Sequence, residues 1–309
     1  MNKMLGQNWI LLRGLARESA HWGAFVPLLQ STFPDAQITL LDLPGTGCFH
    51  QETSPSSIKA ITDSVRSHAL GKGVMQQPVT ILALSLGAMV AWEWMRRYPD
   101  DICGAVLMNT SFADLSPFYQ RLRWQSYKDF IALAMARNLH KRESGVLRLT
   151  SNRRNISRDG VYAAGQSGTG AAISRDGVYA AGQSGTGAAI SRDGVYAASQ
   201  SGTGAAQHKQ LARAWEKIQN ERPISLKNSV RQIIAAASYR PGDTKPEQPV
   251  LLLNGLGDRL VAPACSEAIH KKWDLELRRH PWAGHDLTLD HGEWVAMQLK
   301  DWLAQNRLD

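Results

Sequence analysis

The sequence predicts an α/β protein with a mostly parallel, doubly wound sheet and a helical insertion. Residues 79–84 form an unbroken apolar run that leads directly into a helical pattern, as is typical of a strand buried on both faces. Strand-like and helix-like segments alternate between residues 9 and 108, which favours parallel strands joined by crossover helices. The periodicity then turns helical after residue 111, and a strand pattern returns only at residue 249.

Each element is predicted from its apolar pattern and from the residues that end it. Apolar runs that end at Gly, Pro, Asn or Asp predict strands at 9–12, 37–43, 79–84, 102–108, 249–253 and 275–280. Apolar stripes at helical spacing predict helices at 21–32, 54–68, 86–97, 118–139, 225–239, 264–273 and 291–303, with a further stripe at Leu211, Trp215 and Ile218.

The elements group into a core in two parts, 1–111 and 246–309, around a helical cap insertion at 112–245. The aromatic and apolar residues Trp124, Phe130, Met135 and Trp215 are expected mainly to pack inside this insertion, with an apolar acyl pocket as the alternative.

A tandem repeat lies inside the insertion. Three copies of the 17-residue unit ISRDGVYAAGQSGTGAA occupy 156–206, and they differ only at Ser199. Each copy has only Ile, Val and Tyr as sizeable apolar residues, which is too little to order a core. We interpret the repeat as a tolerated loop expansion, with a short β-solenoid as the alternative. Without it, 258 residues remain, a suitable size for one domain with a cap.

The chain is basic, with a net charge of +8. The densest basic zone spans 137–158, and we expect it to be the solvated face of helices. The alternative is a docking patch for an acidic partner, such as a phosphopantetheine carrier protein, or for an anionic substrate. No nucleic-acid-binding motif accompanies the charge, so a nucleic-acid partner is not expected.

Compartment and cofactor expectations come from what the sequence lacks. Its three cysteines are widely spaced, without CxxC neighbours, which favours reduced thiols in a cytoplasm and no structural metal. No apolar run has the length of a membrane span or a signal peptide. We therefore expect a cytoplasmic protein that contacts no membrane and needs no cofactor.

Ser85 is the candidate nucleophile. It follows the buried strand at 79–84 within the pattern Ala83-x-Ser85-x-Gly87, which is a nucleophile elbow with Ala in place of the first Gly. The chain must reverse from strand to helix at this serine, so only small neighbours fit beneath it. The turn exposes the hydroxyl at a helix N-terminus, where the Leu86 N–H can face a developing oxyanion. The competing interpretation is a helix-capping serine.

A base and an acid follow Ser85 in the chain order that this elbow requires. Asp258 comes after the strand at 249–253, and His285 comes after the strand at 275–280. Because parallel strands end at one edge of the sheet, we expect both side chains to converge on Ser85. Asp114 and Asp286 are competing acids.

Two further histidines are competing candidates, and one loop completes the candidate site. His280 and His291 lie near His285, but their spacing matches no metal-ligand motif. The second oxyanion donor should come from the loop after the first strand. There, Gly14 permits a tight turn and places the Leu15 N–H as the natural donor.

These motifs resemble the α/β-hydrolase superfamily, and specifically compact bacterial capped carboxylesterases such as pimeloyl-carrier methyl ester esterases. The resemblance rests on Arg13-Gly14-Leu15 with Trp22, on Asp42-Leu-Pro-Gly-Thr-Gly47, and on the elbow, Asp258 and His285, and it covers residues 9–110 and 249–305. Arg13 stands where the family has His, and the family's first strands have no counterpart before residue 9.

The resemblance implies a serine hydrolase of carboxylic esters or thioesters. In that function Ser85 attacks, His285 serves as base and then acid, Asp258 orients the histidine, and the Leu86 and Leu15 amides hold the oxyanion. Two rival functions remain. One is another chemistry that the superfamily hosts, namely C–C hydrolysis, a lyase reaction or a cofactor-free haloperoxidase. The other is a non-catalytic binding module on the same fold.

Overall fold

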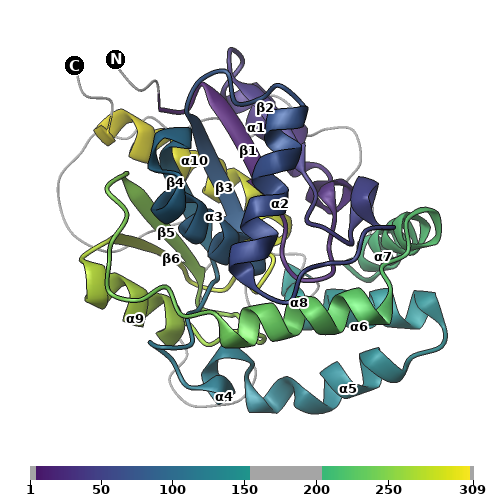
Figure 1. The fold of residues 1–309 in the computed structure, drawn as a ribbon. Coiled ribbons are helices and arrows are strands. Elements are labelled where there is room, and N and C mark those ends of the chain that lie inside the picture. Colours follow the sequence, from purple (N-terminus) through teal and green to yellow (C-terminus); the bar gives the residue numbers. More distant parts are fainter. Residues whose placement is uncertain (1–4, 154–203, 307–309) are drawn as a thin grey trace.

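Six parallel strands form one sheet in the order β2-β1-β3-β4-β5-β6 (Figure 1). The computed structural model describes residues 5–153 and 204–306, so nearly all of the tandem repeat lies outside the described residues. The predicted doubly wound parallel sheet is confirmed. The strands are β1 (Asn8–Leu12), β2 (Gln37–Leu41), β3 (Val79–Leu84), β4 (Ile102–Met108), β5 (Val250–Gly255) and β6 (Glu276–His280).

Helices cover both faces of the sheet, and successive side chains of each strand point to opposite faces. In β1, Ile10 and Leu12 join the apolar cluster under α2, α3 and α9, whereas Trp9 and Leu11 join the cluster under α1 and α10. This two-sided burial explains the continuous apolar runs of the sequence. The flanking helices are α1 (Phe25–Thr32), α2 (Ile58–Gly71), α3 (Leu86–Arg97), α9 (Ala264–Trp273) and α10 (Leu287–Asn306).

Three predicted helix boundaries in the core are wrong by a few residues. The first helix is interrupted at Gly23, whose φ of +50° separates a 3-10 turn from α1. The second begins only at Ile58, because the Ser57 side chain accepts the Ala60 N–H and caps the helix there. The last begins four residues early, at Leu287, and is kinked at His291.

Between β4 and β5 the structure describes residues 112–153 and 204–245, which we call the insertion, and these residues form five α-helices. The single helix expected at 118–139 is wrong, since extended residues at Leu122 and Ala136 divide that stretch. The insertion helices are α4 (Phe118–Arg121), α5 (Tyr127–Met135), α6 (Leu139–Thr150), α7 (Gly204–Glu221) and α8 (Leu226–Ser238), with η4 (Trp124–Ser126) before α5.

The insertion helices gather on one side of the sheet, below it in Figure 1. Leu147 of α6 packs against Ala212 and Trp215 of α7 in a small apolar cluster of their own. The packing expectation holds for Trp215 but fails for Trp124 and Met135, which are 64% and 76% exposed. No described helix combines the length and hydrophobicity that a membrane-spanning segment needs.

Candidate active site

Ser85 sits on a sharp turn between β3 and α3. Its φ of 56° and ψ of −113° are outside the regions that ordinary side chains favour. Neighbouring backbone holds the turn: the Ser85 N–H donates to the Met108 carbonyl at 2.8 Å, and the Thr110 hydroxyl donates to the Ser85 carbonyl at 2.9 Å. The side chain is half-buried. The strand–Ser–helix arrangement expected from the sequence is therefore present.

Small residues let the loop after β1 approach this turn closely. A Cβ added to Gly87 would come within 2.6 Å of the Arg13 carbonyl oxygen and 2.7 Å of the Leu12 carbonyl oxygen. A Cβ on Gly14 would lie 3.2 Å from the Ser85 Cβ. The first strand's end and the elbow are thus in backbone contact, which a larger residue at position 87 would prevent.

The two expected oxyanion donors flank this contact. Leu86 is the first residue of α3, where a backbone N–H has no acceptor within the helix. Within residues 5–153 and 204–306, neither the Leu86 nor the Leu15 N–H donates to a protein acceptor. Both amides are therefore without a protein acceptor, as is expected of oxyanion donors.

Asp258 and His285 form a buried pair at the ends of β5 and β6. The His285 Nδ1 lies 2.7 Å from the Asp258 Oδ2, and the two residues are 5% and 0% exposed. The other Asp258 oxygen accepts the N–H groups of Leu260 and Val261 at 2.7 and 2.9 Å. The carboxylate is thereby fixed and can hold the histidine in one tautomer and orientation. In the described part of the chain, no hydrogen bond joins His285 to Ser85.

Asn109, which the sequence did not single out, fixes the loops that carry this pair. Its Nδ2 donates to the carbonyls of Gly284 and His285, at 3.1 and 2.8 Å. Its Oδ1 accepts the Gly255 N–H and the Asn254 side-chain amide. The residue has a φ of 47°, and an Asn after a buried strand, a residue type that tolerates left-handed backbone, was the available signal.

Arg13 forms a buried ion pair with Asp286. The closest nitrogen and oxygen are 2.6 Å apart, both side chains are 3% exposed, and the guanidinium lies 4.8 Å above the Trp22 ring. Burial alone would raise the pKa of Asp286, but Arg13 and hydrogen bonds from Thr288 and Leu289 bring it below its usual value. Asp286 therefore joins two loops instead of acting as the orienting acid. One is residues 13–18 after β1, which we call the oxyanion loop after its expected donor Leu15, and the other is residues 281–286 after β6, which we call the histidine loop.

The oxyanion loop also contacts the insertion. The Ala16 N–H donates to Gln232 of α8 at 3.0 Å, and the guanidinium of Arg17 lies 2.6 Å from Glu143 of α6. The next residue along the loop, Glu18, pairs with the arginine that follows α7, Arg222. Three insertion helices thus hold a loop of the core.

A second buried acid, Asp290, ties the end of α6 to the histidine loop. Its carboxylate accepts the Ser151 hydroxyl and the N–H groups of Asn152 and Gly284. Burial raises its pKa to about 6, against the effect of those hydrogen bonds. The segment that leads out of α6 is therefore anchored beside His285.

The competing residues have other partners or positions. Asp114 is exposed. The His280 Nε2 lies 2.7 Å from the His291 Nδ1, and burial, with His291 nearby, lowers the pKa of His280 to about 3. Across the described residues, no group of three or more His, Cys, Asp or Glu side chains could hold a metal.

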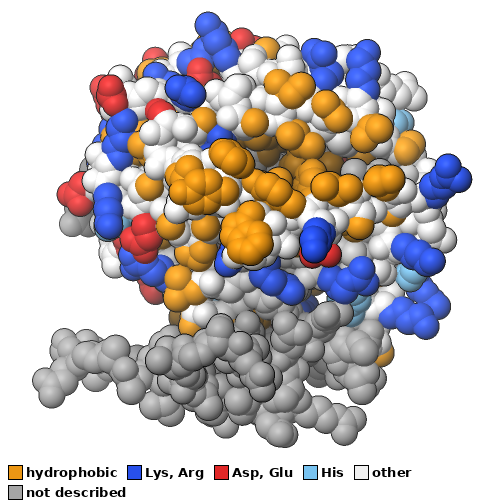
Figure 2. Space-filling view, turned by 90° about the horizontal axis from the view of Figure 1, so that it is seen from below, with side chains coloured by type: hydrophobic (Ala, Val, Ile, Leu, Met, Phe, Trp, Pro, Cys, Tyr) orange, Lys and Arg blue, Asp and Glu red, His pale blue; other side chains and the backbone are white. Residues whose placement is uncertain are grey.

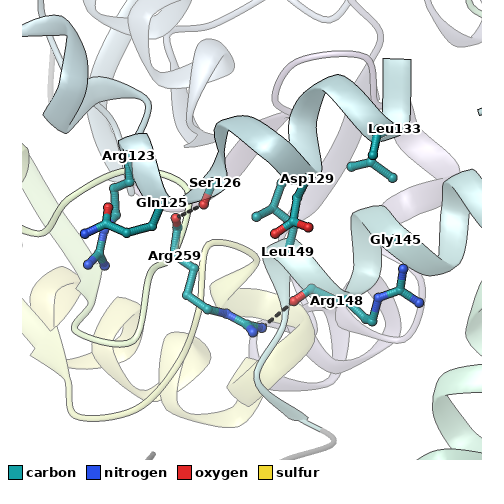
Figure 3. A pocket seen from close by; sticks show the side chains of 10 residues that line it. Arg123, Gln125, Ser126, Asp129, Leu133, Gly145, Arg148, Leu149 and Arg259 are labelled. Atoms are coloured by element: carbon teal, nitrogen blue, oxygen red, sulfur yellow. Dashed lines mark hydrogen bonds between the residues drawn. The ribbon is translucent and has the colours of Figure 1, made fainter. Parts of the chain in front are cut away.

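A cavity of about 340 Å³ lies beside the loop after β5 that carries Asp258, which we call the acid loop (Figure 3). It is lined by side chains from η4, α5 and α6 together with Arg259, the residue after Asp258. The Arg123 guanidinium donates to the Asp258 carbonyl at 2.7 Å, so the cavity adjoins the acid loop without including Ser85 or His285. Three of its lining residues are basic: Arg123, Arg148 and Arg259.

The family model for the alpha/beta hydrolase fold matches residues 10–292. The chain belongs to this family. Membership supports an enzyme with hydrolase activity. No curated protein is similar enough in sequence to give a match.

Solved structures share the fold at low sequence identity. An esterase from Thermogutta terrifontis is 15% identical with a TM-score of 0.64, over 98% of this chain and 92% of its own. A candidate non-heme bromoperoxidase from Mycobacterium tuberculosis is 16% identical with a TM-score of 0.63, over 97% and 92%. A type II thioesterase from the borrelidin biosynthetic cluster is 15% identical with a TM-score of 0.56, over 96% and 92%.

Proposed function

We propose that the chain is a serine hydrolase that cleaves carboxylic ester or thioester bonds of a small acyl substrate through an acyl-enzyme. The observation that supports this function best is the coincidence of three features at one edge of the sheet. These are a serine on a positive-φ turn, a buried Asp258–His285 pair after two neighbouring strands, and amides free to bind an oxyanion.

The roles follow from the geometry. The Ser85 Oγ attacks the substrate carbonyl carbon while the His285 Nε2 takes its proton, and the Asp258 carboxylate stabilises the imidazolium that forms. The Leu86 and Leu15 amides donate to the developing oxyanion. His285 then returns the proton to the departing alcohol or thiol. Water, activated by His285, hydrolyses the acyl-enzyme and regenerates the serine.

We also propose that residues 112–245, which include the insertion, form a cap that selects the substrate. Its contacts with the oxyanion loop support that role, since the loop is the element nearest the expected reaction site. We also propose a cytoplasmic location, consistent with three free cysteines in the structure. An acidic carrier protein as the bearer of the acyl group stays a proposal.

The decisive experiment is labelling with a fluorophosphonate, which reacts with activated serines, combined with turnover of short p-nitrophenyl esters. The parent should be labelled and active, whereas Ser85→Ala and His285→Ala should lose both properties. Asp258→Asn should retain labelling at a strongly reduced rate, with kcat lower by about 10⁴-fold, the usual effect of losing the orienting acid. A folded parent that is neither labelled nor active would contradict the proposal.

A second candidate is cofactor-free haloperoxidase chemistry, which the likeness to the bromoperoxidase brings into consideration. The same serine, histidine and aspartate would carry out this chemistry, so substitutions at these residues do not distinguish the two functions. A panel of esters, acyl thioesters and peroxide-dependent bromination does distinguish them. Bromination in the absence of ester turnover would favour the second candidate. A chain that binds these substrates but converts none would favour the binding-module function.

A further inference from the structure

The positive charge of the protein lies in its insertion. Residues 112–153 and 204–245 carry 16 Lys and Arg against six Asp and Glu, a net charge of +10. Residues 1–111 and 246–309, which contain the sheet, carry 15 basic and 18 acidic residues, a net charge of −3. Six of the core's acidic residues are buried, against one of its basic residues, so the core surface is close to neutral and the positive surface charge is concentrated on the insertion.

The insertion also exposes most of the large apolar side chains that are found on the described surface. Eight of the eleven belong to α4, η4, α5 and α8, and Figure 2 shows hydrophobic side chains gathered around a hollow in this side of the molecule. We call them the apolar face: Phe118, Tyr119, Trp124, Ile131, Met135, Leu226, Val230 and Ile234.

The size of the apolar face separates it from ordinary surface exposure. Its members are 44–76% exposed. At about 150–250 Å² for an aromatic side chain, and somewhat less for an aliphatic one, their exposed areas sum to on the order of 1,000 Å². The largest apolar patch on a typical monomer covers about 300–600 Å². Leu226, Val230 and Ile234 follow one another at a spacing of four residues on α8, so they form a stripe that faces away from the core.

Basic side chains surround this face in Figure 2. Lys128 on α5 and Lys227 on α8 are exposed beside apolar members of the face, and neither pairs with an acid within the described residues. The cavity lined by Arg123, Arg148 and Arg259 is carried by η4 and α5 as well (Figure 3). Apolar and cationic groups are therefore combined on the same elements.

We propose that the apolar face and its basic surroundings dock the protein peripherally on an anionic lipid surface. Aromatic rings and aliphatic side chains insert at the boundary between head groups and acyl chains, while Lys and Arg contact the phosphates. The combination of the two signals is what peripheral binding requires, since either alone is weak. An acidic protein would bind better to a compact basic site, whereas the cations of this face are spread over several helices.

The inference goes beyond the reaction at Ser85 and does not depend on it. The expectation of no membrane contact came from the missing spanning segment, which has no bearing on surface docking. Because the insertion also holds the oxyanion loop, a lipid surface bound there would lie next to the expected entrance for an acyl substrate.

Co-sedimentation with vesicles tests the proposal. The parent should bind vesicles of phosphatidylcholine mixed with phosphatidylglycerol, and it should bind pure phosphatidylcholine and the mixed vesicles at high salt much more weakly. Lys128→Gln/Lys227→Gln should bind about thirtyfold more weakly, from the usual contribution of a cation near an anionic surface. Lys72→Gln/Lys300→Gln, directly after α2 and on α10, makes the same charge change at exposed sites outside the insertion and should bind like the parent.

The apolar half is tested separately. Phe118→Ser/Leu226→Ser should weaken binding by at least about tenfold. Leu70→Ser/Met297→Ser, at sites 48% and 49% exposed outside the insertion, is the matched control and should have no effect. Circular dichroism verifies the fold of each variant, and Ser85→Ala should bind like the parent.

Two results would overturn the proposal: a folded parent that ignores anionic vesicles, and insertion variants that bind no more weakly than their controls. The first would leave an acidic protein as the partner for this face. A loss of hydrolysis with vesicle binding intact would contradict the proposed function alone.

Discussion

The buried pair of Arg13 and Asp286 allows a quantitative prediction from Arg13→Met. The substitution keeps an apolar stem over Trp22 but removes the one cation that, among the described residues, pairs with the Asp286 carboxylate. Of the contacts that the structure describes, the carboxylate would keep the hydrogen bonds from Thr288 and Leu289. Breaking a buried pair by removing one partner typically costs about 3–5 kcal/mol, because the remaining charge stays buried. That is a large part of the 5–15 kcal/mol typical of a domain.

Urea unfolding at neutral pH, followed by circular dichroism, measures this loss. Arg279→Met is the matched control, since its pair with Glu267 is 41% and 32% exposed and should contribute at most about 1 kcal/mol. In the double variant Arg13→Met/Asp286→Asn, the buried charge is gone. Its loss of stability should therefore fall short of the sum of the single losses by about 2 kcal/mol or more.

The pH dependence gives an independent sign test. In the parent, the pKa of Asp286 is held below its usual value, so its contribution to stability is present above the unfolded pKa and disappears as the pH falls through the folded one. Without Arg13, burial should raise that pKa, and the variant should become more stable relative to its neutral value as the pH falls. Single-variant losses below about 1 kcal/mol, or strictly additive losses, would refute the reasoning.

Three further predictions concern the loops of the candidate site. Asn109→Ala should lower the free energy of unfolding by about 2–4 kcal/mol in urea titrations and slow ester turnover. The substitution leaves two carbonyls beside His285 without their donor and places Ala at a positive φ. Unchanged turnover would argue against a role of Asn109 in positioning the His285 loop. Gly87→Ala should nearly abolish turnover, because its Cβ would meet backbone carbonyls at 2.6 and 2.7 Å, whereas Gly71→Ala, with nothing within 4 Å, should not. Because the pKa of Asp290 is raised to about 6, its contribution to stability should increase as the pH falls from about 6 toward the unfolded value, and Asp290→Asn should remove that slope from the pH profile of unfolding.

The sequence was most informative where one pattern decides one element. The run at 79–84 and the small residues around Ser85 predict both the buried strand and the turn, because few other structures tolerate them. Asp258 and His285 could be paired from topology alone, since parallel strands end at one edge. The family's first strands do not figure in the six-stranded sheet that the structure describes.

What the sequence did not predict depends on contacts between distant segments. Nothing in the local pattern indicates that Arg13 meets Asp286 or that Asn109 holds two loops, because each partner lies more than a hundred residues away. The division of the 118–139 stretch was missed for a related reason. The stretch contains no Gly or Pro to signal a break, and the breaks at Leu122 and Ala136 become visible only in the folded chain.

The attachment of the oxyanion loop to three insertion helices has a consequence for protein engineering. An exchange of the segment between β4 and β5 as a unit would leave the loop after β1 behind. Here, residues 16–18 would lose Gln232, Glu143 and Arg222 in that exchange, and two buried or half-buried charges would lose their counterions. A working chimaera should therefore take residues 13–18 from the same parent protein as the helices, because the loop and the helices depend on each other's charged and polar partners.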